Sequence, residues 1–172
     1  MIALGSHRHS LLRLFTWLLF VGVLLPVRGA EKMDEFTQAV AQYELTLPKL
    51  ESYGAVLAGV AAWAEANPTK AAALRARAPK GPSTFKQAIA QIEAEPAIAE
   101  QLKKHQLTAR DFALIPMAAM QAQIAALGEA QGRTFPADRI NPKNTALVRA
   151  HEVRVGEILK QVTADRARAF GR

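Results

Sequence analysis

His151 is the residue whose type and spacing most suggest chemistry. It lies four residues after Leu147 and four before Val155, which predicts that it faces the core side of a helix. There it could act as a ligand or a buried proton donor, or serve as a hydrogen-bonded imidazole at the edge of the core. Because a ligand set needs convergent partners, we expect the structural role.

The methionines raise the alternative of a haem site. Met33 near the start of the mature chain and His151 on the last predicted helix could ligate haem between them in a helical bundle. Met117 and Met120 lie at helical spacing, where methionine more often fills the core. The chain has no Cys, so the Cys-x-x-Cys-His attachment of c-type haem is excluded. We therefore expect no cofactor and keep His151 and Met33 as the candidate pair for one.

No catalytic or metal-binding motif is present in the sequence. Glu152 follows His151, but His-Glu-Val-Arg-Val lacks the second histidine of a zinc-protease helix. Acidic pairs such as Glu93 with Glu95 fall at predicted helix ends, so no two carboxylates share an apolar face for acid–base work. The Gly-x-Ser-x-Gly, phosphate-loop and dinucleotide fingerprints are absent as well. The sequence favours a protein with no catalytic and no metal-ligating residues.

Pro116 marks a second place of interest, because it falls well inside the helix predicted to start at Thr108. A proline there cannot donate to the carbonyl of Phe112, and an interior proline costs about 3 kcal/mol. We expect the helix to kink at this point. The kink could wrap the helix around the core, or it could line a cavity or ligand groove. Phe112 and Pro116 are the candidate residues of such a cavity.

Capping signals divide the rest of the mature chain into helices. A capping side chain followed by proline, or by a second polar side chain three residues on, marks the helix starts at Thr46-Leu47-Pro48, Asn67-Pro68, Thr84 with Gln87, Thr108 with Asp111, and Asn141-Pro142. Apolar residues recur every three or four positions, and no alternating strand pattern is found. We predict an all-α fold, a bundle of about four longer helices plus short connecting helices. The helix after Thr108 should be central, and the one after Asn141 should be the last.

Residues 1–30 are expected to be a signal peptide and residues 31–172 a single helical domain. An apolar run from Leu14 to Leu25 follows a basic start, Pro26 ends it, and cleavage could follow Gly29 or Ala30. The run is shorter than the roughly 18 to 20 residues that span a bilayer. These features predict a periplasmic or secreted bacterial protein. The alternative is an uncleaved leader that anchors the protein in the membrane.

The charge of the mature chain argues against nucleic acid as a partner. Without three leader arginines the chain keeps 19 basic and 15 acidic residues, a net charge of +4 that is spread along the sequence. Arg166, Arg168 and Arg172 form a basic tail, expected to be a solvated helix end. With no cysteine available for disulfides, stability must come from packing, which a chain of this size can supply.

Two segments carry a resemblance to a known group of proteins. They are Leu107-Thr108-Ala109-Arg110-Asp111-Phe112 before the long apolar helix, and Asn141-Pro142-Lys143-Asn144 with Leu147 to His151 after it. The region from Thr46 to Val162 resembles a family of secreted, Ala-rich helical bacterial proteins with no assigned activity. The resemblance implies export and a helical fold, and it implies no site residues.

The sequence therefore predicts an exported helical protein with a non-enzymatic binding or structural role in the cell envelope. One alternative is a bundle that binds haem or a hydrophobic ligand between its long helices. Another is a membrane-anchored envelope protein with an uncleaved leader. The expected partner is an unidentified protein or a small hydrophobic ligand, and the membrane enters only through an uncleaved leader.

Overall fold

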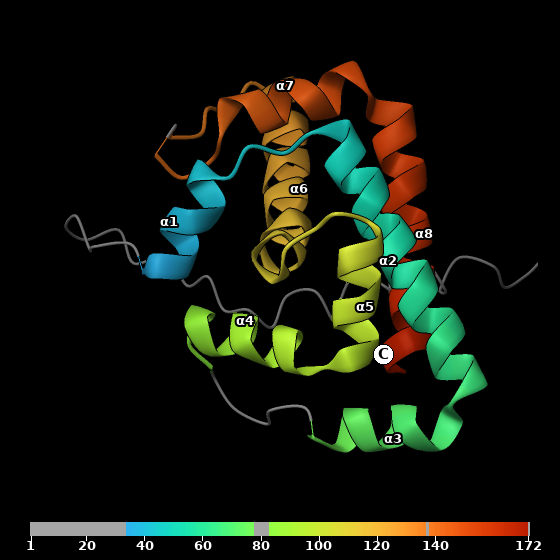
Figure 1. Ribbon diagram of the computed structural model, residues 1–172. Coiled ribbons are helices and arrows are strands. Elements are labelled where there is room, and N and C mark those ends of the chain that lie inside the picture. The colour runs from blue at the N-terminus through green and yellow to red at the C-terminus, as the bar shows by residue number, and fades with distance from the viewer. Residues whose placement is uncertain (1–33, 78–82, 137, 172) are drawn as a thin grey trace, which may run out of the picture. The chain divides into compact units, whose positions relative to one another are not determined.

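Residues 34–77, 83–136 and 138–171 are described by the computed structural model, and among them the chain forms helices and no strand. The predicted all-α class is confirmed (Figure 1). The helices are α1 (Glu35–Gln42), α2 (Leu47–Ala66), α3 (Pro68–Arg77), α4 (Phe85–Ala94), α5 (Pro96–Lys104), α6 (Ala109–Ala130), α7 (Pro142–Ala150) and α8 (Glu152–Phe170). The expected leader and Met33 lie outside the described residues.

Local capping explains where most of these helices begin. The side chains of Thr46 and Asn141 accept hydrogen bonds from the first turns of α2 and α7. Thr84 and Thr108 each form a complete capping box, with Gln87 in α4 and with Asp111 in α6. Each cap satisfies backbone N–H groups that a helix start would otherwise leave unpaired. These predicted starts are therefore confirmed.

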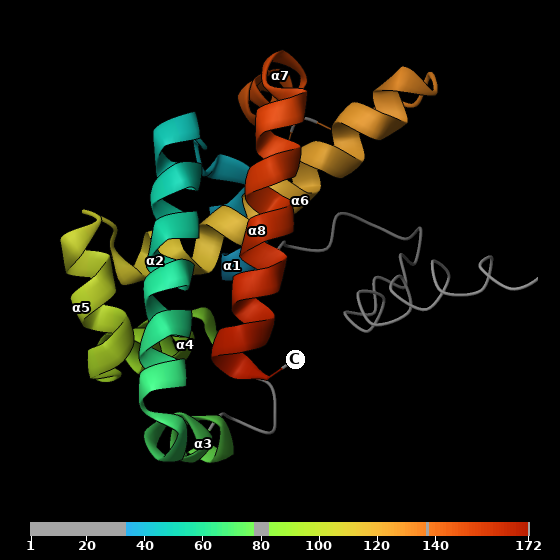
Figure 2. The same cartoon turned by 90° about the vertical axis from the view of Figure 1, so that its right-hand side faces the viewer.

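Helices α2 and α8 lie side by side and run in the same direction (Figure 2). Arg154 donates to Glu51 at 2.8 Å and Arg168 donates to Glu65 at 2.7 Å, and both pairs are separated by 103 residues. A constant separation along both helices requires a parallel pair. In Figure 2 these two helices stand nearly upright, whereas α6 runs obliquely across them, so α6 crosses the pair.

The core forms where α6 meets this pair. Its fully buried large side chains include Leu50, Val56, Leu57 and Val60 from α2, Leu114 and Ile115 from α6, and Val155 from α8. The prediction that α6 is central holds for its first two thirds, where a row of alanines is buried. Towards its end, Ile124 and Leu127 are 52% and 64% exposed, so this part of the helix leaves the core.

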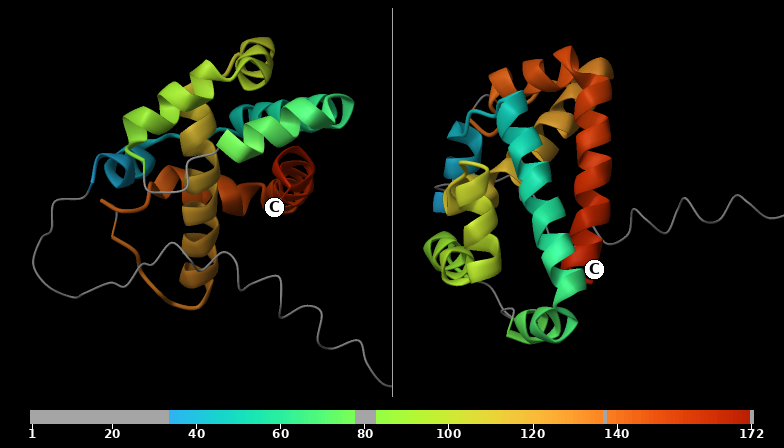
Figure 3. Two further views of the ribbon diagram at one scale, coloured as in Figure 1. Left: turned by 90° about the horizontal axis from the view of Figure 1, so that it is seen from below. Right: turned by 45° about the vertical axis from the view of Figure 1, so that its right-hand side comes forward.

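The chain turns a corner at His151, between α7 and α8 (Figure 3). The sequence predicted one helix through this point with His151 on its core side, and that prediction is wrong. His151 is exposed and takes φ −129° and ψ 33°, outside the helical range. The physical reason is tertiary, because α7 packs on α6 whereas α8 packs on α2. No helix within the described ranges is long and apolar enough to cross a membrane.

Candidate functional site

A cavity of about 450 Å³, partly open to solvent, lies beside Pro116 and is lined by side chains from six helices. Its lining residues are Tyr53 and Leu57 of α2, Arg75 of α3, Ile92 of α4, Ile98 of α5, Phe112, Ala113, Pro116 and Met117 of α6, and Arg166 and Phe170 of α8. Most of this wall is apolar. Sites for small molecules in proteins typically have volumes of about 300–1,000 Å³ and walls of this kind.

The α6 side of the cavity follows from helical spacing. Phe112, Ala113, Pro116 and Met117 occupy one face because they are separated by one, three or four positions. The helix continues through Pro116, and the carbonyl of Phe112 lacks the N–H it would otherwise receive from that position. Both residues that the sequence singled out thus lie in the wall. The ring of Phe112 also packs at 5.3 Å from the ring of Tyr53.

Three polar residues line the cavity: the buried Tyr53 and two arginines, Arg75 and Arg166, whose side chains are exposed. No carboxylate is part of the lining, and neither arginine forms an ion pair with any described residue. Tyr53 is only 3% exposed, and this burial raises its pKa to about 12, although the charge of Arg166 acts in the opposite direction. Its hydroxyl therefore remains a neutral donor around neutral pH.

These three residues were missed by sequence reasoning. They come from α2, α3 and α8, and no local motif connects them. Arg166 was expected in a solvated basic tail, and it is indeed exposed, but it also lines the open side of the cavity. Its neighbour Arg168 pairs with Glu65 and Asp165. The arginines of the last helix could have pointed to Arg166, whereas no signal in the sequence points to Tyr53 or Arg75.

The proposed haem pair gains no support from the geometry. His151 is exposed at the α7–α8 corner and takes no part in the cavity wall, and Met33 lies outside the described residues. Of the methionines, Met117 does line the cavity. Among the described residues, no three His, Asp or Glu side chains gather as a metal site would require.

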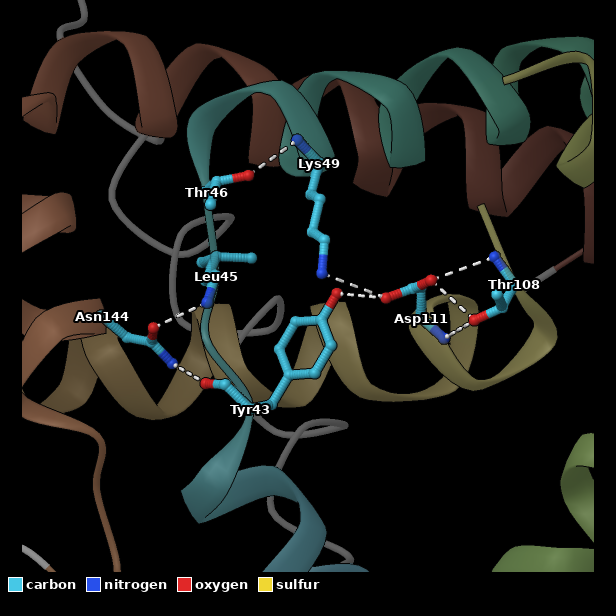
Figure 4. A network of polar contacts seen from close by, with 7 residues as sticks. All are labelled: Tyr43, Leu45, Thr46, Lys49, Thr108, Asp111 and Asn144. Carbon is cyan, nitrogen blue, oxygen red and sulfur yellow. Dashed lines mark hydrogen bonds and ion pairs between the residues drawn. The ribbon is translucent and has the colours of Figure 1, made fainter. Parts of the chain in front are cut away.

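A separate polar network surrounds the extended segment between α1 and α2 (Figure 4). The hydroxyl of Tyr43 donates to Asp111 at 2.7 Å, and Lys49 donates to the same carboxylate oxygen at 3.4 Å. Thr108 donates to the other oxygen of Asp111 through its backbone N–H, at 3.0 Å, and through its hydroxyl, at 2.6 Å. The capping box of α6 is thereby tied to the segment that follows α1.

Asn144 holds the other side of this segment. Its side-chain oxygen accepts from the N–H of Leu45 at 2.8 Å, and its side-chain nitrogen donates to the carbonyl of Tyr43 at 2.8 Å. Asn141 donates to the same carbonyl at 3.1 Å. Because Asn144 is only 2% exposed, these bonds satisfy a buried amide and an extended backbone together. The two sequence segments that carry the family resemblance therefore meet at Tyr43.

The network is built as a structural clamp. Burial acts to raise the pKa of Asp111, but hydrogen bonds from Thr108 and Tyr43 and the charge of Lys49 outweigh it and lower the pKa to about 2. Burial and the bond to Asp111 raise the pKa of Tyr43. At neutral pH the Asp111 carboxyl therefore stays ionised and the Tyr43 hydroxyl stays protonated, so neither of these two groups exchanges a proton there. We therefore take the cavity beside Pro116, and not this network, as the candidate site.

Comparison with known proteins finds no matching family model, no matching curated protein and no matching solved structure. The resemblance to secreted Ala-rich helical proteins stays a prediction. The cavity is consequently the one feature of the described residues from which a function is proposed below.

Proposed function

We propose that this protein binds a small, largely apolar molecule in the cavity beside Pro116. The observation that carries the proposal is the cavity itself, a space of about 450 Å³ walled mainly by apolar side chains of six helices. Filling it with an apolar ligand would remove the lining from water, at about 25 cal/mol per Å² of apolar surface buried. Hydrophobic burial is thus the expected source of affinity.

The same lining supports binding without catalysis. Its polar members are two arginines and one tyrosine whose pKa is raised to about 12. An arginine stays protonated, and a neutral tyrosine is a poor base, so neither type removes a proton from a ligand at neutral pH. These groups can orient a ligand by hydrogen bonds and charge.

Export is the second half of the proposal. The basic start, the apolar run from Leu14 to Leu25 and the small residues Gly29 and Ala30 support a cleaved leader and a periplasmic or secreted location. Mass spectrometry of the protein from its native cell tests this half. An N-terminus at residue 30 or 31 is expected, and one still at Met1 would contradict cleavage.

Calorimetric titration with octanol and with octanoate tests the binding itself. We expect at least one of these probes to bind with a stoichiometry of one. Ala113→Phe, which fills the cavity, should abolish the binding, and Met117→Trp provides a second filling variant should the first fail to fold. The control is Ala58→Phe, because Ala58 is exposed in the groove between α2 and α8.

Two results would contradict the proposal. One is the absence of heat with both probes on a protein whose circular dichroism spectrum shows it to be folded. The other is undiminished binding by both filling variants, which would place the ligand elsewhere. Equal loss in the Ala58→Phe control would likewise point away from the cavity.

A further inference from the structure

The charged groups of the cavity identify the class of its ligand. We infer that the ligand is an amphipathic anion, a single medium-length apolar chain with a carboxylate head, held by Arg75 and Arg166. This inference rests on the proposed function, since it names what the cavity takes. It adds that the affinity depends on charge as well as on burial.

Polar and apolar lining residues come from different helices. The two arginines belong to α3 and α8, whereas α4, α5 and α6 contribute only apolar residues, namely Ile92, Ile98, Phe112, Ala113, Pro116 and Met117. A wall divided in this way matches a molecule with one charged end and one apolar end. A uniformly apolar ligand would leave the arginine side of the cavity without a partner.

The two arginines gather near the end of α8. Arg166 and Phe170 are four residues apart and so share one face of α8. A Cβ atom placed on Gly171 would lie 3.6 Å from both Cδ and Nη1 of Arg75, so the Arg75 side chain lies against the residue that ends α8. The helices α3 and α8 are in contact here. The charge of Arg166 acts to lower the pKa of Tyr53, against the larger effect of burial.

Neither arginine of the cavity wall is neutralised by a carboxylate of the described residues. Arg154 and Arg168 are each bonded to a glutamate of α2, whereas Arg75 and Arg166 have no carboxylate within 4.0 Å among the described residues. Two guanidinium groups on one cavity repel each other, and an anion between them would remove that repulsion. A carboxylate suits them because guanidinium N–H groups bind its two oxygens in parallel.

The volume of the cavity favours a ligand with one apolar chain over a ligand with two. A space of about 450 Å³ lies towards the lower end of the range for small-molecule sites. We therefore choose octanoate as the probe of the anion and octanol as its neutral counterpart of equal chain length. Both have eight carbon atoms, and octanol has one methylene more than octanoate, so a higher affinity for octanoate must come from its charged head group.

The experiment compares both probes on three proteins by calorimetry. Wild type should bind octanoate at least about tenfold more tightly than octanol, because a hydrogen bond to a charged group is worth enough for such a ratio. The double variant Arg75→Gln/Arg166→Gln should bring this ratio close to one, mainly by weakening octanoate. The control Arg77→Gln/Arg154→Gln removes two charges from the same two helices, outside the cavity wall, and should keep the ratio.

The outcomes separate this inference from the proposed function. The inferred anionic ligand is wrong if wild type binds both probes equally, or if the Arg75/Arg166 variant keeps the preference for octanoate. The proposed binding of an apolar molecule would stand in either case. If the control loses the preference as fully as the cavity variant, net charge and not the cavity explains it, and the inference also fails. If neither probe binds, the proposed function itself is wrong.

Discussion

Glycines in the long helices differ in what surrounds them. A Cβ atom at Gly54 of α2 would lie 3.7 Å from Ile158 and 3.8 Å from Val162, which is ordinary van der Waals contact. At Gly128 of α6 the same atom would overlap the ring of Phe135, which packs directly on the glycine. The first glycine is therefore replaceable, whereas the second is required by a close approach.

We predict that Gly54→Ala stabilises the protein by about 0.5–1 kcal/mol, because alanine has the higher helix propensity. Gly128→Ala should destabilise it by about 1–3 kcal/mol, since the ring of Phe135 must move. Urea denaturation measures both changes. Gly156→Ala is the control for propensity alone, because a Cβ atom there meets nothing within 4 Å. A loss of stability in Gly54→Ala would show that α2 and α8 pack more closely than described.

Asp111 should make the free energy of unfolding depend on pH in the acidic range. Its pKa falls from the model-compound value of 3.8 to about 2 on folding, so its ionised form stabilises the folded state above about pH 4. This contribution should be lost as the pH falls from about 4 towards about 2. Tyr43→Phe removes one donor to the carboxylate, which raises the folded pKa towards 3.8.

Tyr43→Phe is therefore expected to be less stable than wild type at neutral pH and to lose less stability on acidification. The free energy of unfolding in urea, measured at neutral pH and again near pH 2, gives both quantities. Thr37→Val is a suitable control, because it removes a hydroxyl that bonds to exposed Asp34 outside the network. A Tyr43→Phe protein with the same pH dependence as wild type would contradict the assignment of the low pKa to this network.

At the scale of elements, the parallel pair of α2 and α8 depends unequally on its two ion pairs. Arg154 bonds to Glu51 and Glu157, which are both exposed. Arg168 bonds to Glu65 and also, at 2.7 Å, to Asp165, whose side chain is 0% exposed. Exposed pairs are worth little, whereas a buried charge that loses its partner is costly.

We predict that Arg168→Gln destabilises the protein by about 2 kcal/mol or more, and that Arg154→Gln costs less than about 1 kcal/mol. The first variant leaves the buried carboxylate of Asp165 with Gln161 as its remaining partner. The double variant Arg168→Gln/Asp165→Asn should recover much of the loss, because it removes the unpaired charge. Chemical denaturation of the four proteins tests this, and equal costs for the two single variants would refute it.

The sequence predicted the elements whose causes are local. The caps at Thr46, Thr84, Thr108 and Asn141 depend on side chains within three residues, and all four were placed correctly. The corner at His151 has no proline or glycine to announce it. It exists because neighbouring helices hold α7 and α8 in different directions, and no pattern along one helix contains that information.

The candidate site was predictable to the same limited extent. Pro116 is visible in the sequence as a proline inside a helix, and with Phe112 it indicated one wall of a cavity. The charged side was hidden, because Arg75 and Arg166 are far apart in the chain and meet only after α3 and α8 have packed. Spacing within a helix can predict which of its residues share a face. It cannot predict which face of another helix will pack opposite them.

For the whole molecule, the position of the cavity determines how a ligand should act on stability. Six helices contribute to its wall, including α3, which otherwise contacts the rest of the described chain through α2 and α8. A bound ligand would contact all of them, and its binding site would be lost when they separate on unfolding. Binding should therefore stabilise the folded domain as a unit and raise its Tm.

The size of this effect follows from linkage. At a free ligand concentration of one hundred times Kd, the folded state gains about 2.7 kcal/mol, which for a domain of this size corresponds to a rise in Tm of several degrees. Each added methylene should strengthen binding about fourfold, from about 0.8 kcal/mol per buried CH₂, until the chain outgrows the cavity. Thermal unfolding followed by circular dichroism, with carboxylates of increasing length, measures both trends.

The filling variant Ala113→Phe provides the decisive comparison in this series. Its Tm should not respond to any of the carboxylates, whereas Ala58→Phe should respond as wild type does, since Ala58 is outside the wall. An affinity that rose with every added methylene without limit would indicate adsorption to exposed apolar residues such as Leu127, which is 64% exposed. A plateau at one chain length that is lost in Ala113→Phe would show that a space of limited depth holds the apolar chain and that this space is the cavity beside Pro116.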